Sequence, residues 1–347
     1  MANGVYILAN DVVYDQLIAL ISSLERNVGI DLPICVVPYD DNTEKSRLAT
    51  QRYPQVQWFD DDALLNKWET FASDIWRSHP AAIADWKARG IVGVGRMGMH
   101  RRFCCFDGPF DRFIYLDADI LAMNNFDLLF NSLDNYDFVT YDFQYKDLSH
   151  VFAVDAPNLT DVFERDRLDT EIFCAGLFAS KKGLFTSSML SDLLTSLQAG
   201  EADILYYNGP DQSILNYMVM KSGVKAMNLA RTLPADVRTG CCVTSSHFKE
   251  QDRVLFDKEQ QLIYLHYIGV GSRFFSRLCA GENILLPYRD LFLYYRYLHS
   301  SDRPALKGAP ISYDAPTTTI GTKVANKAER LVSRVTRPFR KASALKG

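Results

Sequence analysis

Two aspartates, Asp117 and Asp119, follow directly on an apolar run and are the first candidates for chemistry. The run Phe113–Leu116 holds four large β-prone residues, which predicts a strand buried on both faces. A buried carboxylate without a positive partner costs several kcal/mol. If the backbone stays extended between the two aspartates, both side chains point the same way, and a hard cation such as Mn²⁺ or Mg²⁺ would compensate both charges.

A D-x-D triplet is common by chance, so its place in the fold has to support the metal interpretation. In open α/β sheets ligands bind outside the carboxyl ends of the strands, where this triplet is expected. A third candidate, His266, ends the apolar run Leu262–Tyr267, and a loop with Gly269 and Arg273 follows it. A lone histidine on a strand is more often a core residue, but a basic glycine-containing loop after it suits a phosphate group.

Two further groups of residues could contact the remainder of a phosphorylated ligand. Arg101 and Arg102, about sixteen residues before the aspartates, are candidate partners of a diphosphate, although adjacent arginines are more often a solvated helix face. Asp211 and Gln212 follow a Gly-Pro turn. Helix capping explains Asp211, whereas Gln212 needs no capping role and is the more suggestive of the two.

The elements that would position these residues alternate between strand and helix. Val5–Leu8 is a predicted strand, and a helix is predicted from Tyr14 to Arg26 because leucines recur at spacings of three and four. The turn between them faces the ligand crevice in a doubly wound α/β fold, so Asn10, Asp11 and Tyr14 could contact a base or ribose. Helix capping by either polar residue is an equal alternative.

Later segments continue the same pattern. A largely helical stretch is predicted over 63–106, and a strand over Ile172–Ser180, where the small pair Ala175 and Gly176 permits close approach of a ligand. We predict one α/β domain over 1–299 and a linker over 300–322, which is rich in Pro, Thr, Ser and Gly.

Residues 323–347 form a predicted basic amphipathic tail. They hold eight Lys/Arg and one Glu, so with a net charge of −4 for the whole chain the rest carries −11. An acidic body argues against nucleic-acid binding. A basic helix with an apolar stripe is typical of a peripheral anchor on an anionic membrane, while a solvated tail is the simpler alternative.

Cysteine usage and the apolar pattern indicate a cytoplasmic protein. Seven cysteines, an odd number without C-x-x-C spacing, predict reduced thiols and no disulfide framework. No signal peptide precedes the first strand, and no apolar run is long enough to span a membrane.

The motifs in this order resemble the family 8 retaining glycosyltransferases, which have the GT-A fold, and look closest to a cyanobacterial group of sugar transferases. The motifs are Ala-Asn-Asp after the first strand, an arginine before Tyr-Leu-Asp-Ala-Asp, Ala-Gly, Pro-Asp-Gln and His-x-x-Gly, over residues 4–280. The resemblance implies a single GT-A (Rossmann-like) domain with a mixed central sheet and a C-terminal helical extension.

The resemblance also implies roles for the residues. Asp117, Asp119 and His266 would bind Mn²⁺ (or Mg²⁺). The donor would be a nucleotide diphosphate sugar, with a UDP-sugar the expected one, and the acceptor an unidentified hydroxyl. Asp211 and Gln212 would line the sugar pocket as catalytic residues. The remaining implied donor contacts are Asn10, Asp11, Tyr14, Arg101, Arg102, Ala175, Gly176, Gly269 and Arg273.

The chain departs from the family pattern at two places, which keeps two other functions open. Cys174 stands where the family has Asn, and Ser272 stands at the family's Lys, with Arg273 one residue later. A non-catalytic, membrane-associated nucleotide-sugar binder is therefore one alternative. A phosphatase of the haloacid dehalogenase type is the other, although Leu121 replaces the Thr that its motif requires.

Overall fold

The computed structural model describes residues 2–313 and builds them around one seven-stranded sheet, in the order β3-β2-β1-β4-β7-β6-β8. The first four of these strands are parallel, β7 is antiparallel to both β4 and β6, and β8 is parallel to β6. The strands are β1 (Asn3–Ala9), β2 (Ile34–Pro38), β3 (Val56–Trp58), β4 (Arg112–Asp117), β6 (Phe138–Thr140), β7 (Leu177–Lys181) and β8 (Ala226–Asn228). The predicted mixed sheet is confirmed.

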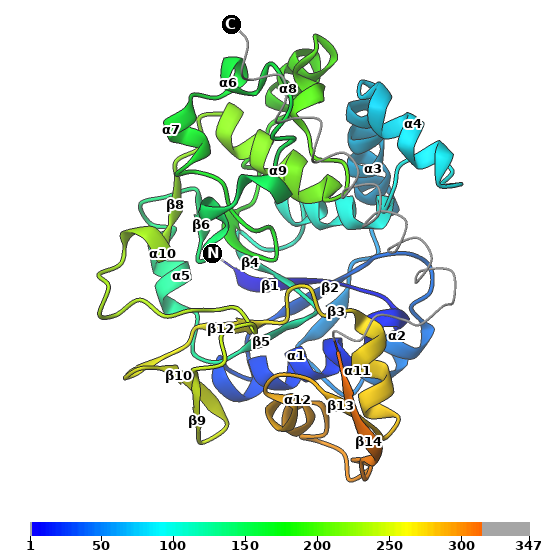
Figure 1. Ribbon diagram of the computed structural model, residues 1–347, viewed down its shortest axis with the longest axis vertical. Coiled ribbons are helices and arrows are strands. Elements are labelled where there is room, and N and C mark those ends of the chain that lie inside the picture. The colour runs from blue at the N-terminus through cyan, green and yellow to red at the C-terminus, as the bar shows by residue number, and fades with distance from the viewer. Residues whose placement is uncertain (1, 314–347) are drawn as a thin grey trace, which may run out of the picture.

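Helices cover both faces of this sheet, which explains why its central strands are apolar at successive positions (Figure 1). Side chains alternate between the faces of a strand, so Tyr6 and Tyr115 enter one core while Ile7 and Ile114 enter the other. The helices above the sheet in the figure include α3 (Asp62–Arg77), α4 (Pro80–Ala88), α8 (Ser187–Gln198) and α9 (Pro210–Lys221), and α1 (Tyr14–Asn27) lies below it.

A separate two-stranded ribbon brings a late segment of the chain to the end of β4. Its strands are β5 (Ile120–Ala122) and β12 (Tyr264–His266), which pair antiparallel with His266 opposite Ile120. Tyr267 N also donates to Asp119 O at 2.9 Å. The pairing register therefore places the imidazole beside the D-x-D turn.

A C-terminal layer packs against α1. It contains α11 (Ser272–Cys279), α12 (Arg289–Arg296), β13 (Glu282–Leu285) and β14 (Lys307–Ser312), and its apolar side chains form a third core. The remaining named helices and strands are α2 (Glu44–Thr50), α5 (Asp127–Ser132), α6 (Leu159–Val162), α7 (Arg165–Leu168), α10 (Leu229–Thr232), β9 (Lys249–Gln251), β10 (Val254–Asp257) and β11 (Gln260–Gln261).

The range 300–322, predicted as a linker, is in part a strand. Residues 307–312 form β14, which pairs in parallel with β13. This pairing gives the backbone N–H and C=O groups of the segment hydrogen-bond partners. The domain limit at 299 stays a prediction, and the predicted tail over 323–347 lies outside the described residues. Within 2–313 no helix combines the length and the apolar character needed to cross a membrane.

Two predicted elements differ from the structure. The helical stretch 63–106 is broken after α4 by a glycine-containing loop, and its last part, η2 (Met97–Phe106), is a 3-10 helix. The strand predicted from Ile172 starts only at Leu177. The preceding Ala175 gives its N–H and C=O to two side chains, so it has no backbone groups left for a neighbouring strand.

Candidate functional site

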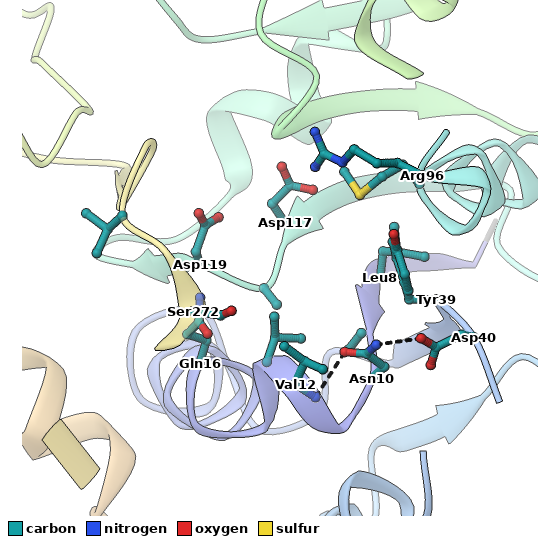
Figure 2. A pocket seen from close by; sticks show the side chains of 15 residues that line it. Leu8, Asn10, Val12, Gln16, Tyr39, Asp40, Arg96, Asp117, Asp119 and Ser272 are labelled. Carbon is teal, nitrogen blue, oxygen red and sulfur yellow. Dashed lines mark hydrogen bonds between the residues drawn. The ribbon is translucent and has the colours of Figure 1, made fainter. Parts of the chain in front are cut away.

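The two aspartates lie at the carboxyl end of β4, where they were expected. Register pairs Asp117 with Leu8 near the end of β1, so the turns after both strands open on the same edge of the sheet. The sequence suggested an extended backbone between the aspartates, but the structure has a turn there. Both side chains nevertheless line one cavity of about 450 Å³ (Figure 2).

His266 completes a cluster with these carboxylates. Ligand atoms of Asp117, Asp119 and His266 all lie within 4.8 Å of one another, and His266 Nε2 is 3.2 Å from Asp119 Oδ1. Burial favours the neutral imidazole, but the Asp119 carboxylate outweighs it and raises the pKa of His266 well above its ordinary value. Without a cation at the site, the histidine is therefore the positive partner of Asp119.

Gly176 leaves the space in which this cluster fits. A Cβ atom at this position would lie 2.4 Å from His266 Cε1 and 3.1 Å from Asp117 Oδ2. Gly176 O also accepts from Asp117 N at 2.8 Å, which fixes the end of β4 against this segment. The glycine is thus required by the close approach of its backbone to two of the three candidate ligands.

The donor set of the cluster fits a divalent cation. It combines two carboxylates with one imidazole, which suits Mn²⁺ and Mg²⁺ with added water or phosphate oxygens. Asp119 Oδ1 is buried and makes no hydrogen bond of normal geometry among the described residues, so this oxygen is available to a cation. The three predicted ligands lie together, and their binding of a metal stays a prediction.

Arg102 has a role that the sequence did not reveal. Its side chain is 1% exposed, and its Nη2 lies 3.2 Å from Asp117 Oδ1 and 2.9 Å from Asp211 Oδ2. Its Nη1 donates to Ala175 O at 2.7 Å, and its guanidinium packs over the ring of Tyr115. Arg102 therefore joins the acidic end of β4 to the start of α9 from beneath the site.

The electrostatics follow from this bridge. Burial raises the pKa of Asp117 above its usual range, and the nearby Arg102 opposes that rise. Burial would lower the pKa of Arg102, but Asp117 and Asp211 raise it above its ordinary value. Arg102 is consequently charged, and its charge is already shared between two carboxylates.

Arg101 turns away from the cavity. Its Nε donates to Glu69 at 2.5 Å and its Nη1 to Pro38 O at 3.1 Å, so the side chain ties η2 to α3 and β2. Neither of the two arginines lines the cavity wall. Their contact with a diphosphate stays a prediction to which the geometry gives no support.

The turn after β1 divides the three predicted base contacts. Asn10 lines the cavity, accepts from Val12 N and donates to Asp40 Oδ2 at 2.9 Å. Asp11 instead accepts from the backbone N–H groups of Lys45 and Ser46 at the start of α2, as a helix cap does. The structure therefore brings Asn10 alone of these three to the cavity wall.

Tyr14 follows this turn as the first residue of α1. The ammonium of Lys45 sits 3.6 Å from the centre of its ring, and the guanidinium of Arg296 sits 5.0 Å from it. Tyr14 does not line the cavity. Its position between two cations makes it a packing residue that joins α1 to α2 and α12.

Gln212 braces two loops beside the cluster. Its Oε1 accepts from Ala175 N at 3.0 Å, and its Nε2 donates to His150 O at 2.9 Å. Proline at the first turn of α9 and Asp211 after it start the helix that presents both residues. The Pro-Asp-Gln motif thus carries one residue bound to Arg102 and one bound to the Ala-Gly segment.

The loop after β12 provides the wall opposite β1. Gly269 has φ +80°, and Val270 and Ser272 line the cavity. Arg273 turns aside, with its guanidinium 4.8 Å from the centre of the Phe274 ring. The arginine that could have replaced the family's lysine is therefore not in the cavity wall.

Sequence reasoning missed several residues at the site. The cavity is lined also by Gln16, Tyr39, Asp40, Arg96 and Met99. These come from α1, the turn after β2, the residue before η2 and η2 itself, and no short motif marks them. Asp142 was also missed. It is buried, and its Oδ1 accepts from Cys174 N, in the segment beside the cluster, while its Oδ2 has no hydrogen-bond partner among the described residues.

Comparison with known proteins identifies a fold but no family. No known family model matches the sequence, and no curated protein matches it. The WbbM bifunctional glycosyltransferase in its apo form aligns with a TM-score of 0.50 at 16% identity, over 85% of this chain and 49% of its own. This chain therefore spans about half the length of that protein.

Two further solved structures are similar. The galactosyltransferase LgtC in complex with donor and acceptor sugar analogues has a TM-score of 0.49 at 14% identity, over 79% of this chain and 94% of its own. Mouse xyloside xylosyltransferase 1 in its apo form has a TM-score of 0.48 at 15% identity, over 65% of this chain and 85% of its own. At such identities the likeness to WbbM shows the fold alone, and it confirms the predicted GT-A architecture.

Proposed function

We propose that the protein is a metal-dependent retaining glycosyltransferase of family 8 that transfers a sugar from a UDP-sugar to an acceptor hydroxyl. One observation carries the proposal, namely that Asp117, Asp119 and His266, from β4, its following turn and β12, bring their ligand atoms within 4.8 Å of one another beside the cavity that both aspartates line. The GT-A architecture supports it, because open α/β sheets bind ligands outside the carboxyl ends of their strands, where Asp117 lies. Membership of the cyanobacterial group rests on the sequence motifs.

The reaction would proceed as follows. The anomeric C–O bond to the diphosphate breaks, the acceptor oxygen forms the new bond on the same face of the sugar, and the acceptor proton passes to the leaving phosphate oxygen. A divalent ion held by Asp117, Asp119 and His266 would neutralise charge on the leaving diphosphate. Asn10 would meet the nucleoside, because it is the polar group that the turn after β1 presents to the cavity.

Gln212 would steady positive charge on the sugar through its amide oxygen. One lone pair of Oε1 accepts from Ala175 N and the second is unused among the described contacts. Its Nε2 bond to His150 O fixes the amide orientation. Asp211 supports the same region indirectly, because it holds Arg102 in place.

The proposal is tested by UDP-sugar turnover with Mn²⁺ in the full-length protein. We expect release of UDP in the wild type and loss of turnover in Asp119→Ala, with Mn²⁺ raising the thermal midpoint of the wild type alone. Intact turnover in Asp119→Ala at saturating Mn²⁺ would refute the metal assignment. Hydrolysis of p-nitrophenyl phosphate without UDP release would favour a phosphatase instead.

A second candidate is a nucleotide-sugar binder without transferase activity. It is favoured by Cys174, whose half-buried side chain stands in the segment that contacts His266, and by Ser272 in the cavity wall where the resemblance expects Lys. UDP binding with Mn²⁺ but no UDP release across a panel of UDP-sugars would establish this function. A Cys174→Asn variant that gains turnover would identify the cause.

We also propose that residues 323–347 hold the protein on the inner, anionic face of a cytoplasmic membrane. The eight basic residues of this segment supply the attraction, at about 1 kcal/mol each near the surface. Co-sedimentation with vesicles of phosphatidylglycerol and phosphatidylcholine should be lost when this segment is deleted. Equal co-sedimentation of both forms would contradict the anchor.

A further inference from the structure

Arg96 is the single cation among the residues that line the site cavity, within the part of the chain that the structure describes. Figure 2 shows it entering from the side opposite Ser272, with Asp117 between them. It forms no ion pair with a carboxylate among residues 2–313. Its guanidinium lies against the hydroxyl of Tyr39, which lines the same cavity. Arg96 is thus a positive charge at the cavity wall that forms no ion pair with a carboxylate of the described residues.

The backbone of Arg96 is strained. It has φ 56° and ψ 40°, in the left-handed region that glycine adopts with the least strain. Gly90 and Gly93, in the loop just before it, have φ +74° and +79°. The loop therefore uses glycine twice at positive φ and arginine once. A strained residue at a ligand cavity is a reason to look for a function of its side chain.

The other arginines near the site have partners that hold them away from the cavity. Arg101 is bonded to Glu69 and Pro38, Arg102 to Asp117, Asp211 and Ala175, and Arg273 lies over Phe274. At position 272, where the resemblance expects a charged lysine, this chain has a serine. Among the described residues, a nucleoside diphosphate in this cavity would therefore meet one guanidinium that is not paired with a carboxylate, that of Arg96.

Charge balance makes that guanidinium necessary. With a neutral imidazole, the carboxylates of Asp117 and Asp119 together balance a divalent cation, so the two negative charges of a bound diphosphate diester stay uncompensated. A guanidinium offers paired N–H donors that match phosphate oxygens, and it is always charged. Asp40 adds one more negative charge to the cavity wall, which increases the need.

We infer that Arg96 binds the diphosphate of the donor and takes the place of the lysine that this chain lacks at position 272. The inference rests on the proposed function, since it assigns a residue to the same site. The cation has moved from the wall formed by α11 to the wall formed by the segment before η2. Arg96 is a binding residue in this arrangement and touches the phosphate oxygens directly.

The test measures binding of UDP and of uridine, each with Mn²⁺, by titration calorimetry and ligand-observed NMR. Arg96→Gln should weaken UDP binding about tenfold to hundredfold, since a charged hydrogen bond is lost, and should leave uridine binding within about twofold. The UDP affinity of Arg96→Lys should lie between that of the wild type and that of Arg96→Gln. Arg96→Gly should weaken UDP binding equally while raising the thermal midpoint, because the backbone strain is released.

The second arm moves the charge back. Adding Ser272→Lys to Arg96→Gln should recover at least half of the lost UDP affinity, which a folding defect would not permit. Arg89→Gln is the matched control, because Arg89 pairs with Asp85 at the surface and does not line the cavity.

The outcomes separate the two proposals. Wild-type binding of UDP that Arg96→Gln leaves unchanged would overturn the role of Arg96 and leave the proposed function standing. Failure of the wild type to bind UDP with Mn²⁺ would overturn both. An equal loss of UDP and uridine binding in Arg96→Gln would show a distorted cavity and would also refute the assignment.

Discussion

Replacing Gly176 with alanine should disable the candidate metal site by steric pressure on one ligand. The added Cβ would lie 2.4 Å from His266 Cε1, whereas an ordinary contact needs at least about 3.4 Å. The imidazole must therefore move by about 1 Å. Metal–nitrogen bonds of about 2.0–2.1 Å tolerate errors of about 0.2 Å, so the displaced ring is no longer a ligand.

The ring has little freedom to accommodate that movement. The backbone of His266 is held on two sides, because the residue pairs with Ile120 between β12 and β5 and its backbone N–H donates to Cys241 O at 2.7 Å. Its side chain contacts Asp119. The alternative is a shift of β7 against β4. The hydrogen bond from Asp117 N to Gly176 O opposes this shift as well. We expect Mn²⁺ affinity to fall about 10–100-fold and the unfolding free energy to fall by about 1–3 kcal/mol.

Two measurements check this prediction. Mn²⁺ binding is followed by electron paramagnetic resonance, and unfolding by urea titration of the metal-free protein. The control is Gly271→Ala, since a Cβ there meets no atom closer than 3.9 Å and its φ of −64° suits alanine. Unchanged Mn²⁺ affinity in Gly176→Ala would refute the placement of His266 in the cluster.

Three further predictions concern buried charges at the site. Arg102→Gln should lower the unfolding free energy by about 3–5 kcal/mol, because two carboxylates lose their partner, and urea titration of the double variant with Asp211→Asn should recover part of it. The deficit should shrink as pH falls, since burial raises the pKa of Asp117 and its protonation removes one of the unpaired charges; a constant deficit would contradict this. Asp142→Asn should be neutral below pH 4 and stabilising by up to about 3 kcal/mol above pH 6, because burial raises the pKa of Asp142 to about 6 and the native state resists its ionisation. A variant of Asp142 that is equally stabilised at pH 4 and pH 8 would refute that cause. Finally, Mn²⁺ binding near pH 7 should release about one proton, seen as a buffer-dependent enthalpy, because the raised pKa of His266 keeps it charged until the metal arrives; no release would mean that His266 is not a ligand.

Asp117 and Asp119 could be predicted from the sequence because they come at the end of an apolar strand. Strand ends of a parallel sheet meet at one edge, so Asp117 and the turn at Asn10 could be placed together from the hydrophobic pattern. His266 was placed by resemblance, and the ribbon of β5 and β12 explains how it arrives. Local pattern was sufficient wherever one strand determined the position of one residue.

Side-chain direction was less predictable, because it depends on partners that are distant in sequence. Arg102 and Arg101 are adjacent, yet one enters the core between two carboxylates and the other bonds Glu69. Asp11 could serve equally as a cap or as a base contact until Lys45 and Ser46 of α2 were placed beside it. Arg96 follows a loop whose path no periodicity defines.

The bridge through Arg102 has a consequence for the evolution of the chain. The arginine is the cation that Asp117 and Asp211 share, so its loss leaves two carboxylates without their partner in the interior. Related sequences that keep both aspartates should therefore also keep the arginine. An apolar interior at this place would require all three residues to change.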